Sequence, residues 1–127
     1  MASRARTKEQ IFRLRKRIAA LPQAARNAVQ PSLDKSADEL VARMQSFAPQ
    51  DDGTLIASIR KTPGDHELAR KVRAGDKAAF YARFVEFGTP KSPAQPFFFP
   101  TFRLLRKRIQ GRTKRAVAKA VRETWKP

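Results

Sequence analysis

The chain has 127 residues, of which 41% are hydrophobic and 31% charged, and it contains no cysteine. These values favour one globular domain spanning residues 1–127 over a disordered chain. The lack of cysteine excludes disulfides and thiolate metal sites and suits a reducing cytoplasm. The formal net charge of +17 lies almost entirely at the two ends, since residues 1–20 carry seven Lys/Arg and one Glu, and residues 101–127 carry ten and one.

This distribution of charge divides the domain into a basic N-terminal helix (1–20), a core (21–100) and a basic C-terminal helix (101–127). A field of this size indicates acidic partners: nucleic acid, an acidic protein surface or a membrane. The alternative is a solvated basic face that serves solubility. No apolar run approaches the roughly 20 residues needed to cross a bilayer. The opening MASRARTKEQ is not followed by an apolar segment, so we expect no signal peptide.

Apolar residues recur at helical spacing in the N-terminal half. One amphipathic stripe comprises Ile11, Leu14, Ile18 and Leu21, and a second comprises Leu33, Ala37, Leu40, Val41, Met44 and Phe47. Pro22 is expected to bend the first helix or start a new one, and Pro31 to interrupt the chain again. The second stripe should end at Ala48-Pro49, because a residue before proline avoids the helical region.

The middle of the chain has the pattern of strands and turns. Residues 55–61 are predicted as a strand or a short turn leading into one, and residues 68–74 as a second strand after the turn at Pro63-Gly64-Asp65. Residues 78–81 are predicted as a third strand, before a short helix or continued strand over 82–87. A proline-rich loop leads to a last helix from Pro100. Its apolar stripe comprises Phe98, Phe102, Leu105, Ile109, Ala116, Ala120 and Val121. This order predicts an α+β fold with helices on one face of a small antiparallel sheet of three to four strands.

Candidate catalytic groups are few. The single histidine, His66, follows a Pro-Gly-Asp turn, and although Ser58 and Asp65 are near it in sequence, no nucleophile motif surrounds them. Five acids sit in or beside turns, where turn formation alone favours them, and their spacing matches no metal site: Asp51, Asp52, Asp65, Glu67 and Asp76. We therefore expect no catalytic, cofactor-binding or metal site; a small hydrolase using His66 is the weakest functional alternative.

The C-terminal helix carries basic residues that would neutralise phosphates. They are Arg103, Arg106, Lys107, Arg108, Arg112, Lys114, Arg115, Lys119 and Arg122. No recognised DNA- or RNA-binding motif accompanies them. Phe97, Phe98 and Phe99 have the ring faces to stack on bases, but between prolines at the start of a helix they fit core or interface roles better. A small basic nucleic-acid-binding protein is thus an alternative function.

Three stretches occur in an order that resembles a known family. They are Ala48 to Ile59 (APQDDGTLIASI), Tyr81 to Thr89 (YARFVEFGT) and Gln95 to Thr101 (QPFFFPT). Together they are similar to the gene-product-ten-like family of phage Hong Kong 97, over about residues 30–125. Two departures are mild: Asp52-Gly53 replaces the usual Thr-Gly, and Thr101 replaces an alanine.

The resemblance implies a structural, non-enzymatic protein of a tailed phage or a phage-derived particle. Its fold would be that of a tail-terminator-like subunit, assembled as a homo-oligomeric ring, commonly of six, at the head–tail junction. Its partners would be the head connector (stopper or adaptor) and tail-tube proteins, with non-specific contact to DNA in the channel and none to membrane. It would be located in the virion after assembly in the host cytoplasm. No catalytic residues are carried over.

The motif residues have structural roles in this interpretation. Gly53 and Gly88 would supply unusual backbone shapes, Leu55, Ile59, Val85 and Phe87 would fill the core, and Tyr81 would be half-buried. Glu86 would bond backbone amides or an arginine, or form an intersubunit salt bridge. Pro49, Pro96 and Pro100 complete the motif. The proline-rich loop 89–99 is the best interface candidate, and the predicted interface residues are Phe97, Phe98, Phe99, Glu86, Arg106, Lys107 and Arg108.

Overall fold

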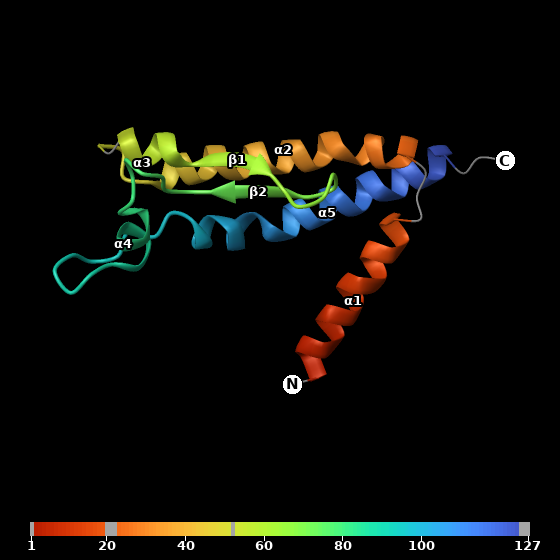
Figure 1. The fold of residues 1–127 in the computed structure, drawn as a ribbon, viewed down its shortest axis with the longest axis horizontal. Helices are drawn as coiled ribbons and strands as arrows, with labels where there is room; N and C mark the ends of the chain where they lie inside the picture. Colours follow the sequence, from red (N-terminus) through yellow and green to blue (C-terminus); the bar gives the residue numbers. More distant parts are fainter. Residues whose placement is uncertain (1, 20–22, 52, 125–127) are drawn as a thin grey trace.

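The computed structural model describes residues 2–19, 23–51 and 53–124, and within the first helix the side chains of residues 7–13, 15 and 16. The elements are α1 (Ala2–Ala19), α2 (Gln23–Phe47), α3 (Gly53–Ser58), β1 (Arg60–Pro63), β2 (Arg70–Arg73), α4 (Ala82–Phe87) and α5 (Phe99–Thr124). They form an α+β fold (Figure 1), which confirms the predicted class. The predictions for Leu21, Pro22 and Asp52, and for the Leu14 and Ile18 side chains, lie outside the described residues.

Helices α2 and α5 lie side by side and form the long body of the molecule (Figure 1). Of the stripe predicted for α2, Ala37, Leu40 and Met44 are buried and Leu33 and Val41 are half-buried. Phe47 is 51% exposed, so its place on the buried stripe is not confirmed. Thr101, Leu105 and Ala120 are the buried positions of α5. Both helices therefore form because each hides one apolar stripe against the other, while their charged faces remain in water.

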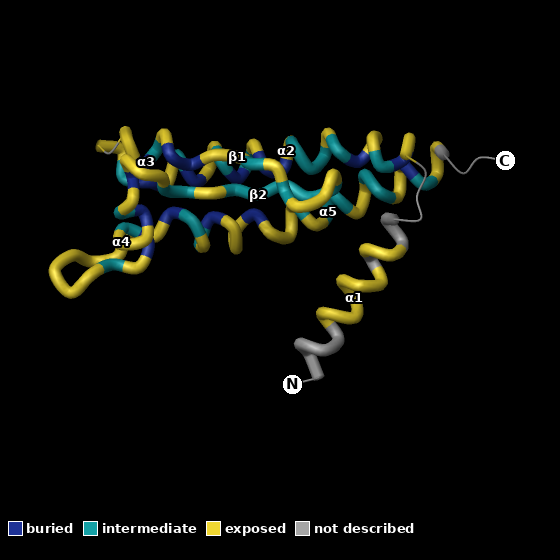
Figure 2. Tube along the Cα trace, in the orientation of Figure 1, coloured by how far each residue is buried: buried dark blue, intermediate teal, exposed yellow. Residues whose placement is uncertain are grey.

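The core has two parts along this body. The larger cluster lies at the α4 end of the body (Figure 2) and is built from α2, α3, α4, α5 and the segments that connect them. Its buried members are Leu40, Met44, Ala48, Leu55, Ile59, Ala79, Ala82, Phe97 and Leu105. The smaller cluster lies at the opposite end and consists of Ala25, Val29 and Ala120. Only the larger cluster contains buried aromatic and long aliphatic side chains, so most of the hydrophobic stabilisation lies near α4.

Strands β1 and β2 form an antiparallel hairpin whose register pairs Arg60 with Arg73 and Pro63 with Arg70. Within the described residues the sheet has these two strands, so the expected three to four strands are not confirmed. The segment predicted as a third strand, residues 78–81, is a turn, because the Ala79 amide donates to the Asp76 carboxylate at 2.7 Å and folds the chain back. The short helix expected over 82–87 is present as α4.

Pro31 lies inside α2, so the prediction that it interrupts the helix is wrong. A proline at this position removes one helical hydrogen bond and crowds the preceding turn, at a cost of about 3 kcal/mol. The helix continues because both sides of the proline are held by packing. Val29 is buried in the smaller cluster before it, and Ala37 is buried after it.

Helix α1 leaves the body at the end opposite α4 and points away from α2 and α5 (Figure 1). Its Ile11 and Phe12 are exposed, although both are large and apolar. The described residues contain no helix that is both long and apolar enough to span a bilayer.

Ion pairs fasten the hairpin to α2. Arg70 donates from Nε to the Asp34 carboxylate at 2.7 Å, and Arg26 donates to Glu67 at 2.9 Å. The hydrogen bond from Arg70 holds the pKa of Asp34 below its usual value, and the hydrogen bond from Arg26 does the same for the pKa of Glu67. The folded chain therefore stabilises the ionised form of both carboxylates.

This geometry predicts acid sensitivity of the hairpin. The pKa values of Asp34 and Glu67 in the folded chain lie below their ordinary values of 3.8 and 4.5. Each carboxylate therefore stabilises the fold fully at a pH above its ordinary pKa. This stabilisation is lost as the pH falls through the pKa that the group has in the folded chain. We expect the double substitution Asp34→Asn with Glu67→Gln to flatten the fall in the free energy of unfolding between about pH 5 and pH 2. Urea titrations at several pH values measure it, and an unchanged slope would contradict the assignment.

Candidate interaction surface

The carboxylate of Glu86 caps the start of α5. Its Oε1 accepts from the amides of Phe97 and Phe98 at 2.9 and 2.8 Å, and its Oε2 accepts from the amide of Phe99 at 3.2 Å. The first turn of a helix has unpaired amides and a positive dipole end, so an acceptor with negative charge is favoured there. Glu86 is 7% exposed. Of the two alternatives for this residue, the structure shows the bond to backbone amides.

The loop between α4 and α5 is closed at its base. The Gln95 amide donates to the Val85 carbonyl at 2.8 Å, and Thr89 and Ser92 pair through their backbones across the loop. Gly88 makes this reversal possible, with φ of 77° and ψ of 171°. This conformation is almost restricted to glycine. A Cβ on Gly88 would also lie 2.7 Å from the Ala94 amide nitrogen.

We expect Gly88→Ala to destabilise the fold by about 1–3 kcal/mol, because the backbone shape and the contact with Ala94 both exclude a side chain. Gly53→Ala is the matched control, since a Cβ on Gly53 meets nothing within 4 Å and its φ is not positive. Alanine at the start of α3 should be neutral or slightly stabilising. Thermal unfolding followed by circular dichroism compares the two, and equal midpoints would contradict the proposed role of Gly88.

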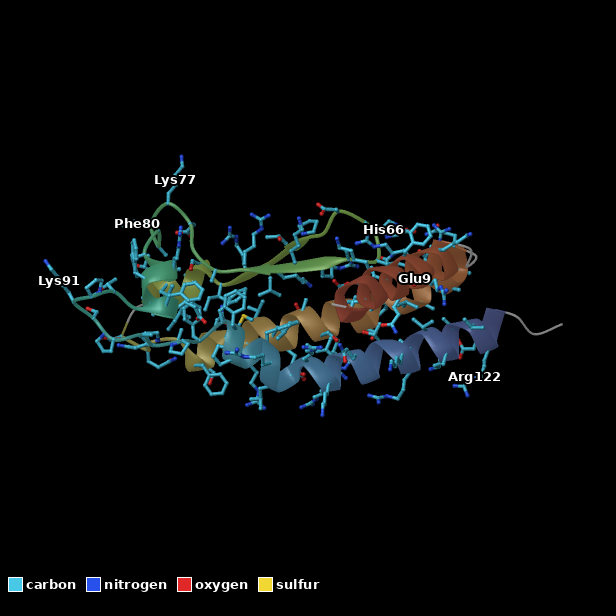
Figure 3. The ribbon with its side chains drawn as sticks, turned by 90° about the horizontal axis from the view of Figure 1, so that it is seen from below. Glu9, His66, Lys77, Phe80, Lys91 and Arg122 are labelled. Atoms are coloured by element: carbon cyan, nitrogen blue, oxygen red, sulfur yellow. The ribbon has the colours of Figure 1, made fainter. Side chains whose placement is uncertain are left out.

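Exposed aromatic side chains gather around α4 and the first turns of α5. We call this surface the aromatic end; its exposed members are Phe80, Phe84, Phe87, Phe99 and Phe102. The rings of Phe87 and Phe99 lie 6.0 Å apart, and those of Phe98 and Phe99 lie 5.2 Å apart. Figure 3 shows Phe80 on the outside of the molecule at this end, far from His66 and Arg122. So many exposed rings in one region are typical of a surface that another protein covers.

The sequence of residues 12–88 matches a family model described as "Bacteriophage HK97-gp10, putative tail-component". The chain belongs to this family. The predicted resemblance is thereby confirmed, and with it a structural role in bacteriophage tails. No curated protein and no solved structure gives a significant match.

The match to the HK97-gp10-like family differs in extent from the expected range of about 30–125. It begins within α1 and ends at Gly88, so it includes the stretches Ala48–Ile59 and nearly all of Tyr81–Thr89. The stretch Gln95–Thr101 and helix α5 lie beyond it. Glu86 thus lies inside the matched residues, whereas the amides that it caps lie outside them.

The structure separates the interface residues predicted for this HK97-gp10-like chain into two groups. Phe97 is 1% exposed and Glu86 is a buried cap, so both are used within the subunit and have little exposed surface. Phe99, Arg106 and Lys107 are exposed, Phe98 is half-buried, and Arg108 is exposed beside Glu39 at 3.4 Å. An interface role for either group stays a prediction.

Other motif residues of the family fall at different depths. Leu55 and Ile59 are buried, whereas Tyr81, Val85, Pro49 and Pro100 are half-buried. Phe87 is 65% exposed, which contradicts its expected place in the core; α4 is short and turns Ala82 and Glu86 inward instead. Pro96 is exposed. Gly53 begins α3 without a positive φ, so no unusual backbone shape is needed there.

Arg112 has a structural role that sequence analysis missed. It was grouped with the phosphate-binding residues, but its side chain is 14% exposed and donates to Ser36 and Glu39 of α2 at 3.0 and 3.3 Å. A signal was available, because Arg112 follows Ile109 by three positions and so lies on the buried stripe of α5. The remaining basic residues of that set are exposed.

The groups considered for catalysis do not come together. Ser58 is buried, donates to the Leu55 carbonyl at 2.6 Å and accepts from the Gly75 amide at 2.9 Å. His66 lies at the hairpin turn (Figure 3), where its Nδ1 accepts from the Leu68 amide at 3.1 Å. No cluster of three potential metal ligands occurs among the described residues. Ser58 and His66 therefore serve local backbone structure.

Proposed function

We propose that this protein is a non-enzymatic structural component of the head–tail junction of a tailed phage or phage-like particle, where copies of it form a ring. The roles of tail terminator, tail-completion protein and neck protein all fit this description. The observation that carries the proposal is the aromatic end, in a chain that belongs to a family of phage tail components. Its neighbours would be head-connector and tail-tube proteins, and its location the virion.

The amount of exposed surface supports assembly. The accessible surface of the chain is 9491 Å². A compact monomer of 14.4 kDa exposes about 6,800 Å² by the scaling of surface with mass, so this chain exposes about 2,600 Å² in excess. A typical protein–protein interface covers about 800 Å² of each partner. The excess includes the surface of the projecting α1, so it is an upper limit on the area that neighbouring copies cover.

The oligomeric state of the purified full chain tests the proposal. We expect native mass spectrometry and negative-stain electron microscopy to show closed rings with one mass. A chain that remains monomeric at every concentration and does not bind head-connector or tail-tube proteins would refute it.

The exposed basic face of α5 favours a contact with DNA or with an acidic neighbouring ring. Its exposed members include Arg106, Lys107 and Arg108. Reversing these three charges to glutamate is expected to lower the yield of joined particles at least tenfold while the subunit still folds, because none of the three is buried. Plaque or transduction titre together with circular dichroism measures both effects. A normal titre would contradict the electrostatic role.

The same basic face supports a second candidate function, a small nucleic-acid-binding protein. A gel-shift titration at physiological salt distinguishes the two. Tight binding by a monomer favours the second candidate, whereas rings with weak, salt-sensitive binding favour the head–tail role.

A further inference from the structure

Two hollows flank α4 on opposite sides. The first, of about 390 Å³, is lined on α4 by Ala82, Arg83, Glu86 and Phe87. The second, of about 330 Å³, is lined by Tyr81, Phe84 and Val85 of the same region. Because successive residues of an α-helix are about 100° apart, these two sets point in opposite directions. The aromatic end thus has two faces, one on each side of α4.

The first hollow is basic and aromatic; we call it the arginine face. Its wall includes Phe87, Phe98 and Phe99, and its rim carries Arg60, Arg73 and Arg83. Its one carboxylate, Glu86, is buried and already bonded to three amides. No ion pair holds any of the three arginines within the part of the chain that the structure describes.

The pairing of Arg60 with Arg73 needs an explanation. Two like charges placed directly opposite each other on neighbouring strands destabilise a hairpin. The guanidinium of Arg60 donates to the carbonyls of Ser58 and Gly75 at 2.7 and 2.9 Å, which fixes it beside the hollow. An acidic group seated in the hollow would relieve the repulsion between the two arginines.

The second hollow has the opposite character; we call it the acidic face. It is lined by Pro49 and Asp51 of the turn after α2, by Phe84 of α4 and by Pro93 of the loop. Asp51 and Phe84 are exposed, and Asp52 follows Asp51 in the sequence. No basic residue lines this hollow.

We propose that the acidic face of one copy docks on the arginine face of the next, and that this contact closes the ring; the inference rests on the proposed function above. The two faces are different, which makes the contact head-to-tail, and a head-to-tail contact generates a closed ring when the rotation is suitable. Asp51 meets the arginines, and the rings of Phe84 and Phe87 supply the apolar area. Complementary charge sets the register and suppresses the face-to-face alternative.

Two charge-reversed variants test the contact. The first carries Arg73→Glu with Arg83→Glu, and the second carries Asp51→Arg with Asp52→Arg; Arg60 is left in place because it bonds backbone carbonyls. We expect each variant alone to lose the oligomer in native mass spectrometry and sedimentation velocity. When the two are mixed, the acidic turn of the first variant meets the basic hollow of the second, and the basic turn of the second meets the acidic hollow of the first. Alternating rings of both subunits should therefore form.

The matched control for the first variant is Lys114→Glu with Lys119→Glu, which makes the same change of charge on exposed residues of α5. It should assemble as the wild type does. If a double variant does not fold, Arg73→Glu alone and Asp51→Arg alone are mixed in the same way.

Each outcome decides a different question. Loss of the oligomer in both variants with restoration on mixing supports the contact. An oligomer that persists in both variants, or that mixing does not restore, overturns the contact but leaves the ring; the arginine face would then receive another particle protein. A wild-type chain that stays monomeric overturns the ring as well.

Discussion

Phe97→Ala should lower the free energy of unfolding by about 3–5 kcal/mol, the range for removing a fully buried phenylalanine ring. Phe97 is 1% exposed and belongs to the larger core cluster, where it lies among side chains of α2, α3 and α5. Truncation leaves a cavity at the point where these helices meet. Because a domain of this size is stable by about 5–15 kcal/mol, this loss removes a large share of the free energy of unfolding and should lower the urea midpoint clearly.

Urea denaturation followed by circular dichroism measures this effect. Phe102→Ala is the matched control, because Phe102 is the same residue type on the exposed side of α5. Its truncation should change the midpoint little. Equal losses in the two variants would show that Phe97 is not a core residue.

Glu86→Ala should cost about 2–4 kcal/mol, because it leaves the amides of Phe97, Phe98 and Phe99 without their charged acceptor. Glu86→Gln keeps one acceptor oxygen and loses the charge, so we expect a smaller loss. The same urea titrations measure both. The helical signal of α5 should also weaken, since its first turn loses its cap.

Glu123→Ala is the control for charge. Glu123 lies in the last turn of α5, where the dipole disfavours a carboxylate, so its removal should be neutral or slightly stabilising. A loss at Glu123 as large as that at Glu86 would mean that total charge, and not the cap, determines stability.

The long helices could be predicted from the sequence, because the apolar side chains that define their periodic pattern are also the ones that pack in the core. The stripes from Leu33 to Met44 and from Leu105 to Ala120 predicted the two helices of the body, and the Pro-Gly-Asp turn predicted the hairpin. Residues 78–81 were predicted wrongly, since apolar side chains suit a strand or a buried turn equally. The side-chain bond from Asp76 to the Ala79 amide decided between them.

The site was harder to predict because its parts meet only in the folded chain. The sequence indicates that a buried Glu86 needs partners, but it does not decide between partners within the subunit and an intersubunit salt bridge. In the fold, the amides at the start of α5 donate to its carboxylate. The arginine face combines Arg60 and Arg73 of the hairpin with Arg83 of α4. No local pattern connects these positions, since the turn at Asp76 sets how the hairpin meets α4.

The division of the core into two clusters has a consequence for slow hydrogen exchange. The far end of the body is held by Ala25, Val29 and Ala120, which offer little apolar area, whereas the end near α4 is held by Met44, Leu55 and Phe97. Local opening costs less where less surface is buried. Amides around Val29 and Ala120 should therefore exchange sooner than those around Met44 and Leu105. Local opening then begins at the end of the body near α1, while the aromatic end stays folded.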